Sequence, residues 1–161
     1  MTEPIDPNAV IGHVHLKVSD LQRSEAFYRD VFGFEVQARY GSEASFLSAG
    51  GYHHHLGLNT WQSKGAPPAP LRHPGLFHFA ILFPDRPALA RAVKRVLDSG
   101  VQLDGASDHG VSEAIYLHDP DNNGIEMYRD RPRDEWPRAA DGSVGMSTMP
   151  LDLEGLLAEA T

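Results

Sequence analysis

Residues 12–20, GHVHLKVSD, and residues 77–85, FHFAILFPD, present the same pattern twice in a chain of 161 residues. In each stretch, a histidine enters an alternating strand, and an aspartate follows the strand just before a helical segment. His78 lies 65 residues after His13, and Asp85 lies 65 residues after Asp20. Because a repeated supersecondary unit buries its apolar face against its copy, the repeat predicts two similar halves of one fold.

Each copy continues into one helix and three strands, which predicts a βαβββ module. In the first copy, Asp20 caps a helix that ends at Gly33, and in the second, Pro87 suits a helix start and Gly100 its end. We therefore expect an α+β fold in which two tandem βαβββ modules form a curled mixed sheet around a metal-binding cavity. The expected strands are 10–18, 34–40, 44–49, 53–59, 77–83, 101–107, 111–118 and 124–129.

The chain divides into an extension, one duplicated domain and a tail. We expect a single domain at 10–131, preceded by an N-terminal extension at 1–9. Module one covers about 10–61 and module two about 76–131, with a proline-rich and glycine-rich joint between them. Residues 132–161 are expected to form a C-terminal tail with a short amphipathic helix, LDLEGLLAEA.

Composition limits the classes of partner. The net charge of −8 disfavours nucleic acid and anionic membranes, and no apolar run reaches the ~18 residues of a membrane span. The first ten residues lack a secretory signal pattern, so a cytoplasmic protein is expected. With no cysteine in the chain, a bound metal must be held by imidazole and oxygen ligands, which directs attention to the nine histidines.

His13 and His78 occupy equivalent positions on the polar faces of the two entry strands. Near the end of module two, the turn DPDNNG leads into a strand that carries Glu126 and Tyr128 on one face. Two imidazoles and one carboxylate can occupy one face of an octahedral metal ion, as in non-haem Fe(II) oxygenases. A metal shared between the two halves is the leading hypothesis.

These segments resemble the vicinal oxygen chelate superfamily, which includes glyoxalase I, fosfomycin and bleomycin resistance proteins, and type I extradiol dioxygenases. The resemblance lies in GHVHLKVSDLQRSEAFYRDVFGF at 12–34, HFAILFPD at 78–85 and LHDPDNNGIEMY at 117–128. It implies that the metal ligands are His13, His78 and Glu126. It also implies Fe(II) as the first choice of metal, with Mn, Ni or Zn as alternatives.

Further segments resemble catechol-2,3-dioxygenase-like proteins. The segment YHHHLGLNTW at 52–61 selects His54 as a catalytic residue, with His53 or His55 as alternatives. The segment HGVSEAIY selects His109 and Tyr116, the latter ten residues before the ligand glutamate. The resemblance implies that His54 manages protons, Tyr116 hydrogen-bonds a substrate oxygen, and His109 assists orientation or protonation.

The implied function is a metal-dependent extradiol-type dioxygenase that cleaves a catechol-like aromatic diol with dioxygen. Such enzymes usually hold two double modules, so a homodimer or the tail after Arg131 is expected to complete the enclosure of the substrate. A glyoxalase I-like isomerase or lyase is the alternative, but it implies a glutamate in the fourth strand of module one, where HHHLGLNTW offers histidines and asparagine. A nonenzymatic drug-binding protein would imply a cavity without metal ligands.

Overall fold

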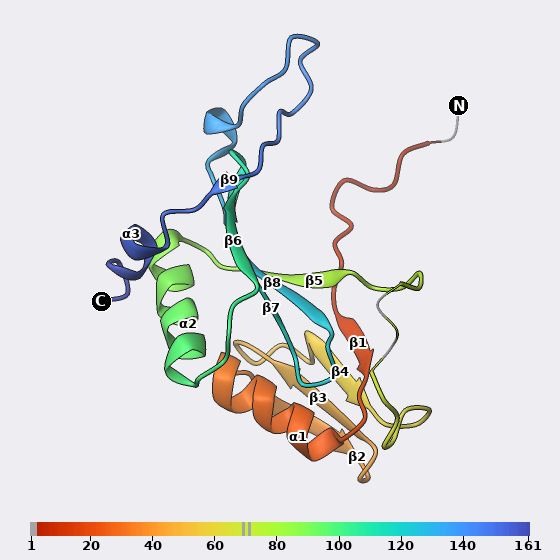
Figure 1. Cartoon of the computed structure of the whole chain (residues 1–161). Coiled ribbons are helices and arrows are strands. Elements are labelled where there is room, and N and C mark those ends of the chain that lie inside the picture. Colours follow the sequence, from red (N-terminus) through yellow and green to blue (C-terminus); the bar gives the residue numbers. More distant parts are fainter. Residues whose placement is uncertain (1–2, 69, 71) are drawn as a thin grey trace. The chain divides into compact units, whose positions relative to one another are not determined.

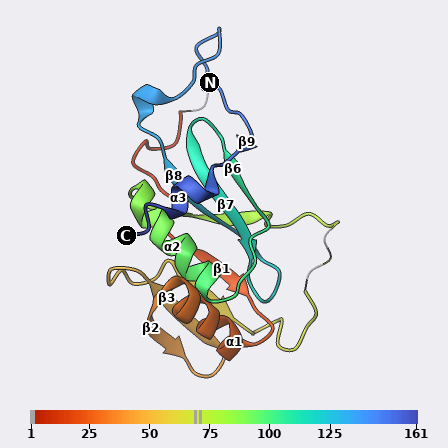
Figure 2. The same cartoon turned by 60° about the vertical axis from the view of Figure 1, so that its left-hand side comes forward.

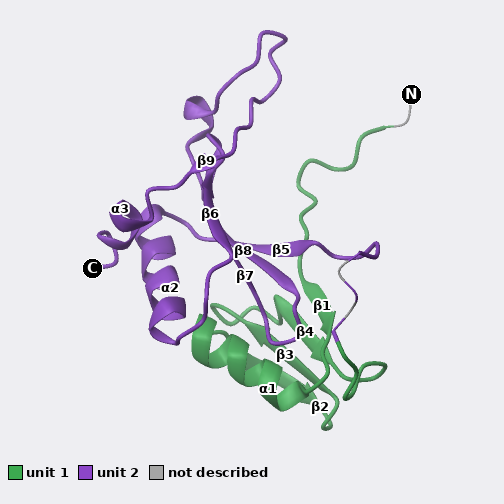
Figure 3. Ribbon diagram, in the orientation of Figure 1, with its two compact units in different colours: residues 1–67 green, residues 68–161 purple. Residues whose placement is uncertain are grey.

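The structure is a computed structural model, and it describes residues 3–68, 70 and 72–161. The chain forms two compact units, Met1–Pro67 and Pro68–Thr161, and each contains one copy of the repeat (Figure 3). Within the described ranges, no helix combines the length and apolar character needed to cross a lipid bilayer.

Unit 1 contains a four-stranded mixed sheet in the order β1-β4-β3-β2 (Figure 1). β1 (Val14–Lys17) runs parallel to β4 (Leu56–Asn59). β3 (Ala44–Ser48) lies antiparallel to both β4 and β2 (Glu35–Tyr40). The first strand of the module therefore pairs with the last, and the intervening hairpin completes the sheet.

The helix of unit 1 changes its winding along its length. α1 (Leu21–Ala26) begins at Asp20, whose carboxylate accepts a hydrogen bond from the backbone N–H of Arg23. The helix then continues as η1 (Phe27–Phe32), a π-helical segment, and ends at Gly33, whose φ of 84° is readily adopted by glycine. The predicted cap and end of the helix are confirmed, whereas the π-helical turns were not expected.

The core of unit 1 combines apolar side chains with one buried carboxylate. Glu25 accepts two hydrogen bonds from Arg39, at 2.7 and 2.9 Å, and one from the Ser45 hydroxyl at 2.7 Å. The hydrogen bonds from Arg39 hold the pKa of Glu25 below its ordinary value, so this carboxylate is charged at neutral pH. The buried apolar residues around the sheet and helix include Leu16, Val18, Tyr28, Leu47, Leu56 and Leu58.

Unit 2 contains a five-stranded mixed sheet in the order β5-β8-β7-β6-β9. β5 (His78–Leu82) runs parallel to β8 (Gly124–Asp130), which lies antiparallel to β7 (Ser112–His118). β6 (Gly105–Asp108) follows, and the short β9 (Met149–Pro150) from the tail adds a fifth strand beside it (Figure 1). The first four strands repeat the order found in unit 1, so the α+β class with tandem βαβββ modules is confirmed.

The helix α2 (Arg86–Asp98) covers one face of the second sheet. Its N-terminus is capped by Asp85, whose side chain accepts a hydrogen bond of 2.7 Å from the backbone of Ala88. The tail helix α3 (Leu153–Leu157) packs beside α2 and buries Leu156 completely (Figure 2). The other fully buried apolar residues of the helix and the sheet include Leu89, Ala90, Val93, Val96, Ile115, Leu117, Ile125 and Met127.

The predicted strand over 53–59 is wrong in its first part. β4 begins at Leu56, and His53–His55 lie in an irregular segment before it. The physical reason is the turn at Gly50 and Gly51, where positive φ angles of 66° and 73° reverse the chain before the ladder resumes. The strands predicted at 10–18 and 101–107 likewise begin later, at Val14 and Gly105.

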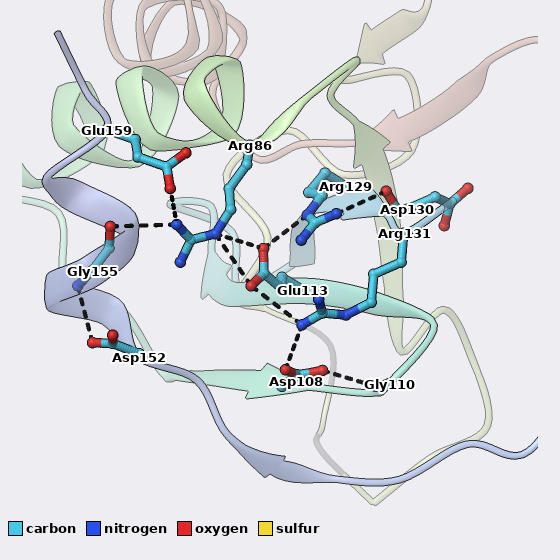
Figure 4. A network of polar contacts seen from close by, with 10 residues as sticks. All are labelled: Arg86, Asp108, Gly110, Glu113, Arg129, Asp130, Arg131, Asp152, Gly155 and Glu159. Atoms are coloured by element: carbon cyan, nitrogen blue, oxygen red, sulfur yellow. Dashed lines mark hydrogen bonds and ion pairs between the residues drawn. The ribbon is translucent and has the colours of Figure 1, made fainter. Parts of the chain in front are cut away.

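Within unit 2, a network of charged side chains connects the tail after Arg131 to α2 and to the sheet (Figure 4). The Glu113 side chain is only 6% exposed, and it accepts hydrogen bonds from Arg86 at 3.0 Å and Arg129 at 2.8 Å. Arg131 lies 3.4 Å from the same carboxylate. Arg86 also donates to the backbone oxygen of Gly155 at 3.4 Å and pairs with Glu159. One buried carboxylate thus links α2, β7, β8 and α3.

Replacement of Glu113 by glutamine should destabilise the protein by about 3 kcal/mol, because the arginines around it lose the buried charge that compensates them. The matched control is Asp98→Asn, which removes the exposed partner of Lys94 on α2 and should change the stability by less than about 0.5 kcal/mol. Urea denaturation followed by circular dichroism measures both. Equal losses of stability in the two variants would contradict the proposed contribution of Glu113 to stability.

Candidate functional site

His78 and Glu126 come together in unit 2, on the neighbouring parallel strands β5 and β8. The register pairs His78 with Gly124 and Ala80 with Glu126, so the two polar side chains share one face of the sheet. His78 Nε2 lies 2.8 Å from Glu126 Oε2, and the Glu126 side chain is 14% exposed. The alternation of β8 places Glu126 on the face opposite the buried Ile125 and Met127.

The spacing of this pair suits a divalent cation. Two ligand atoms at ~2.1 Å from one ion, at a right angle to each other, lie ~3 Å apart. The 2.8 Å between His78 Nε2 and Glu126 Oε2 is close to that spacing. A nitrogen ligand and a hard carboxylate oxygen also fit Fe(II), Mn(II), Ni(II) or Zn(II). These two residues therefore fit a metal site.

Gly124 allows β5 and β8 to approach at this point. A Cβ atom added at Gly124 would lie 2.2 Å from the backbone oxygen of Phe77 and 3.0 Å from His78 Cβ. No side chain fits there without a shift of the backbone. The glycine at the end of the DPDNNG turn is therefore a packing requirement of the strand pair that carries His78 and Glu126.

Tyr116 and His109 extend the polar cluster of unit 2. Tyr116 lies opposite Glu126 in the β7–β8 register, with its hydroxyl 3.5 Å from Glu126 Oε1. The same hydroxyl lies 2.7 Å from His109 Nε2. Burial, and then the charge of Glu126, raise the pKa of Tyr116 above its ordinary value, so the phenol is protonated at neutral pH. Three of the predicted site residues in this unit thus join His78 in a continuous chain of polar contacts.

The backbone of Ser147 reaches the same cluster from the tail. His109 Nδ1 lies 2.8 Å from the Ser147 carbonyl oxygen, and the Ser147 N–H donates to the His109 carbonyl at 3.1 Å. Ser147 was not predicted as part of the site, and no sequence signal could have identified it, because Ser147 takes part in the contact only through its backbone atoms.

A second cluster lies in unit 1, where the His54 ring packs 4.4 Å from the His13 ring and 5.1 Å from Phe46, measured between centroids. Burial, and then the charge that His13 and His53 can carry, lower the pKa of His54 below its ordinary value. His54 is therefore a neutral imidazole at pH 7, able to accept a proton. Of the three consecutive histidines, His54 is the one whose ring packs against the His13 ring.

The neighbours of His54 have other partners. His55 Nδ1 lies 3.3 Å from the backbone nitrogen of Ala49, and the His55 ring packs 4.8 Å from Tyr52. The His53 ring packs 4.0 Å from Tyr52 and touches His54 through the two Nδ1 atoms at 2.8 Å.

The two modules differ at the position that carries the predicted ligand Glu126 in unit 2. The register of unit 1 pairs His15 with Gly57, as that of unit 2 pairs Ala80 with Glu126. Gly57 therefore stands where module two has its carboxylate. A Cβ atom at Gly57 would lie 2.8 Å from the His15 ring, so this imidazole takes the room of a side chain in β4.

The predicted ligand triad is divided between the units. His13 lies just before β1 in unit 1, and the other two ligands lie in unit 2. Among the described residues, no group of three or more ligating side chains is gathered closely enough to hold a metal ion. The structure brings two members of the predicted triad together in unit 2, and the assignment of all three residues as ligands stays a prediction.

A hollow in unit 2 opens beside the polar cluster. Phe77, His78, Tyr116 and Gly124 line it, together with the ion pair of Asp104 and His118. An aromatic and apolar wall next to a potential ligand and a phenol is suited to a small molecule with both apolar and polar parts. His118 is exposed and pairs with Asp104 at this rim.

Comparison with known proteins identifies the relatives of the chain. The family model described as the Glyoxalase/Bleomycin resistance protein/Dioxygenase superfamily matches residues 10–127. A catechol-2,3-dioxygenase of Bacillus subtilis (strain 168) is 46% identical over 151 residues, which are 93% of this chain and 52% of that protein. A biphenyl-2,3-diol 1,2-dioxygenase of Rhodococcus globerulus is 30% identical over 121 residues, 74% of this chain and 63% of that protein. The chain thus spans about half to two thirds of the length of these relatives.

Solved structures share the fold. The lactoylglutathione lyase of Agrobacterium tumefaciens superposes with a TM-score of 0.60 at 25% identity, covering 77% of this chain and 96% of that one. The fold therefore occurs in lyases as well as in dioxygenases, and the choice between these activities depends on the residues of the site.

Substitution of Gly124 by alanine should destabilise the protein by about 3 kcal/mol, because the new methyl group would overlap the backbone oxygen of Phe77, just before β5. Gly105→Ala is the matched control, since Gly105 also lies in a strand of unit 2 and a Cβ atom there meets nothing within 4 Å. The control should lie within about 0.5 kcal/mol of the original protein. Urea unfolding measures both, and a tolerant Gly124→Ala chain would show that the two strands can separate without cost.

Proposed function

The chain belongs to the Glyoxalase/Bleomycin resistance protein/Dioxygenase superfamily, and we propose from this premise that it is a metal-dependent extradiol-type dioxygenase. Its substrate would be a catechol-like aromatic diol, as the names of the two dioxygenase relatives suggest. The observation that carries the proposal is the contact chain of unit 2, in which Tyr116 touches both the proposed ligand Glu126 and His109. That chain places a phenol and an imidazole beside a potential metal ligand pair.

We propose His13, His78 and Glu126 as the metal ligands. His78 and Glu126 are supported by their spacing, and His13 by its equivalence to His78 in the repeat. Fe(II) is the proposed metal, with Mn, Ni or Zn as alternatives that suit the same donors. When bound, the metal supplies the Lewis-acid and redox chemistry toward a diol and dioxygen.

The remaining site residues act on protons and orientation. His54 is a neutral imidazole by the direction of its pKa shift, so it can accept a proton from a diol hydroxyl. Tyr116 is protonated at neutral pH, and its hydroxyl forms a hydrogen bond with a substrate hydroxyl. His109 holds the Tyr116 hydroxyl at 2.7 Å and so fixes its direction. The hollow lined by Phe77 would receive the aromatic ring.

Gly57 argues against the glyoxalase I-like isomerase. That activity implies a glutamate in the fourth strand of module one, at the position equivalent to Glu126. The register places Gly57 there, and the His15 ring occupies the adjacent room. Because module one has no carboxylate at this position, the group that would move the proton in the isomerase reaction is missing there. A nonenzymatic drug-binding role is disfavoured by the polar pair His78 and Glu126.

We further propose that the protein works as a homodimer. The chain spans 52% of the Bacillus relative, so two copies together would have about the length of that longer protein. Light scattering of the purified chain tests this proposal, and a mass near 17.7 kDa would contradict it.

Anaerobic loading with Fe(II), followed by catechol and oxygen, should give a yellow ring-fission product with oxygen uptake in equal amount. The Glu126→Gln variant should lose bound iron and activity together, because it removes an anionic ligand. Turnover of the methylglyoxal–thiol adduct by the Ni(II) or Zn(II) protein, without ring fission, would instead support the isomerase.

The His54→Ala variant should lose ring opening by a factor of about 100 or more while its iron content stays unchanged, because a general base is removed and no ligand is lost. His55→Ala is the matched control, since this neighbouring imidazole packs on Tyr52, and it should keep most of the activity. Iron is measured by atomic absorption. Loss of iron from the His54→Ala protein would reassign His54 as a ligand.

A further inference from the structure

We propose that the backbone carbonyl of Ser147 is a positioning group for the site, because it holds His109 in the tautomer with its proton on Nδ1. In that tautomer, His109 Nε2 has a free lone pair and accepts a hydrogen bond from the Tyr116 hydroxyl. The meaning of this contact for catalysis rests on the proposed function, but the tautomer itself does not.

The direction of each hydrogen bond follows from the chemistry of the atoms. A carbonyl oxygen has no proton, so the 2.8 Å contact between His109 Nδ1 and Ser147 O requires the proton on Nδ1. A neutral imidazole carries one N–H, so its Nε2 is then an acceptor. At 2.7 Å from Nε2, the Tyr116 hydroxyl must donate. The opposite tautomer would set two lone pairs against each other at Ser147.

The tail holds Ser147 in this place by contacts on both sides. Before it, residues 137–145 form a hairpin in which Gly145 N–H donates to the Pro137 carbonyl at 2.8 Å. After it, β9 pairs with β6, with Met149 opposite Asp108. The Ser147 N–H also donates to the His109 carbonyl at 3.1 Å, so the two residues are joined by two hydrogen bonds.

Arg86 anchors the end of the tail farther along. It donates to the Gly155 carbonyl and pairs with Glu159, while its other contacts fasten it to Glu113 in the sheet (Figure 4). The carbonyl of Ser147 is therefore part of a segment secured at β9 and again at α3. A backbone group in such a segment can orient an imidazole as firmly as a side chain does.

The tautomer also defines what the Tyr116 oxygen offers to a ligand. Its single proton has two possible acceptors, His109 Nε2 at 2.7 Å and Glu126 Oε1 at 3.5 Å, and the shorter contact is the stronger. With that proton directed to His109, the phenol oxygen presents lone pairs. The site is thereby suited to a substrate that arrives with a protonated hydroxyl, which can donate to this oxygen.

The test is the protonation pattern of the nine imidazoles in the full chain labelled with ¹⁵N, recorded without metal or substrate at a pH of about 8, where free imidazole is neutral. Two-bond ¹H–¹⁵N correlation spectra distinguish the two tautomers, and the spectrum of His109→Gln assigns the His109 signals by their loss. We expect one neutral tautomer of His109, protonated on Nδ1. A proton on Nε2, or on both nitrogens, overturns the proposal.

Two variants then test Ser147 itself. Ser147→Pro removes the N–H that bonds to the His109 carbonyl and should displace the carbonyl, so the His109 signals should shift to a mixture of tautomers. Ser147→Ala keeps the backbone and should leave the tautomer unchanged. A folded Ser147→Pro chain with pure Nδ1 protonation would overturn the role of Ser147.

The outcomes separate this proposal from the proposed dioxygenase. If Ser147→Pro fails to fold, the wild-type spectrum still decides the tautomer, and the through-bond coupling between His109 Nδ1 and the Ser147 carbonyl carbon decides the partner. Absence of that coupling in a chain with good signal contradicts the contact. An inactive chain with the Nδ1 tautomer would contradict only the dioxygenase.

Discussion

The parallel pairing of β5 with β8 is the contact on which the unit 2 site depends. It brings the strand that opens the module beside the strand that closes it, and so sets a histidine from one beside a glutamate from the other. The pairing is possible at this distance because Gly124 has no side chain. The pairing also positions β8, and β7 pairs with β8 so that Tyr116 lies opposite Glu126. The Tyr116 hydroxyl in turn contacts His109.

The two halves share a topology but have taken different chemistry. In unit 2 a small residue, Ala80, faces a large polar one, Glu126. In unit 1 the sizes are reversed, with His15 facing Gly57. Of these two equivalent strand positions, the one in unit 2 therefore carries a carboxylate. The one in unit 1 is a glycine, beside which the His15 ring packs on Phe46 and Trp61. The two halves thus present different groups on the same topology, a carboxylate beside an imidazole in unit 2 and imidazole and aromatic rings in unit 1.

The sequence was sufficient to predict the repeated elements, because alternation, caps at Asp20 and Asp85, and glycine stops are local signals. The pairing of Tyr116 with Glu126 was also foreseeable, since a tight turn fixes the register of the hairpin between them. The start of β4 was not, because the turn geometry at Gly50 decides it. The approach of Ser147 to His109 was not predictable either, because any residue type could supply the backbone carbonyl that makes the contact.

The strand β9 has a practical consequence for anyone who prepares this protein. The family match ends at residue 127, and a fragment cut at that boundary would keep every side chain of the predicted site. It would nevertheless leave one imidazole without its backbone partner and the sheet with an open edge at β6. Expression boundaries drawn from this family match alone would therefore yield a polypeptide with an unpaired strand edge, which favours self-association.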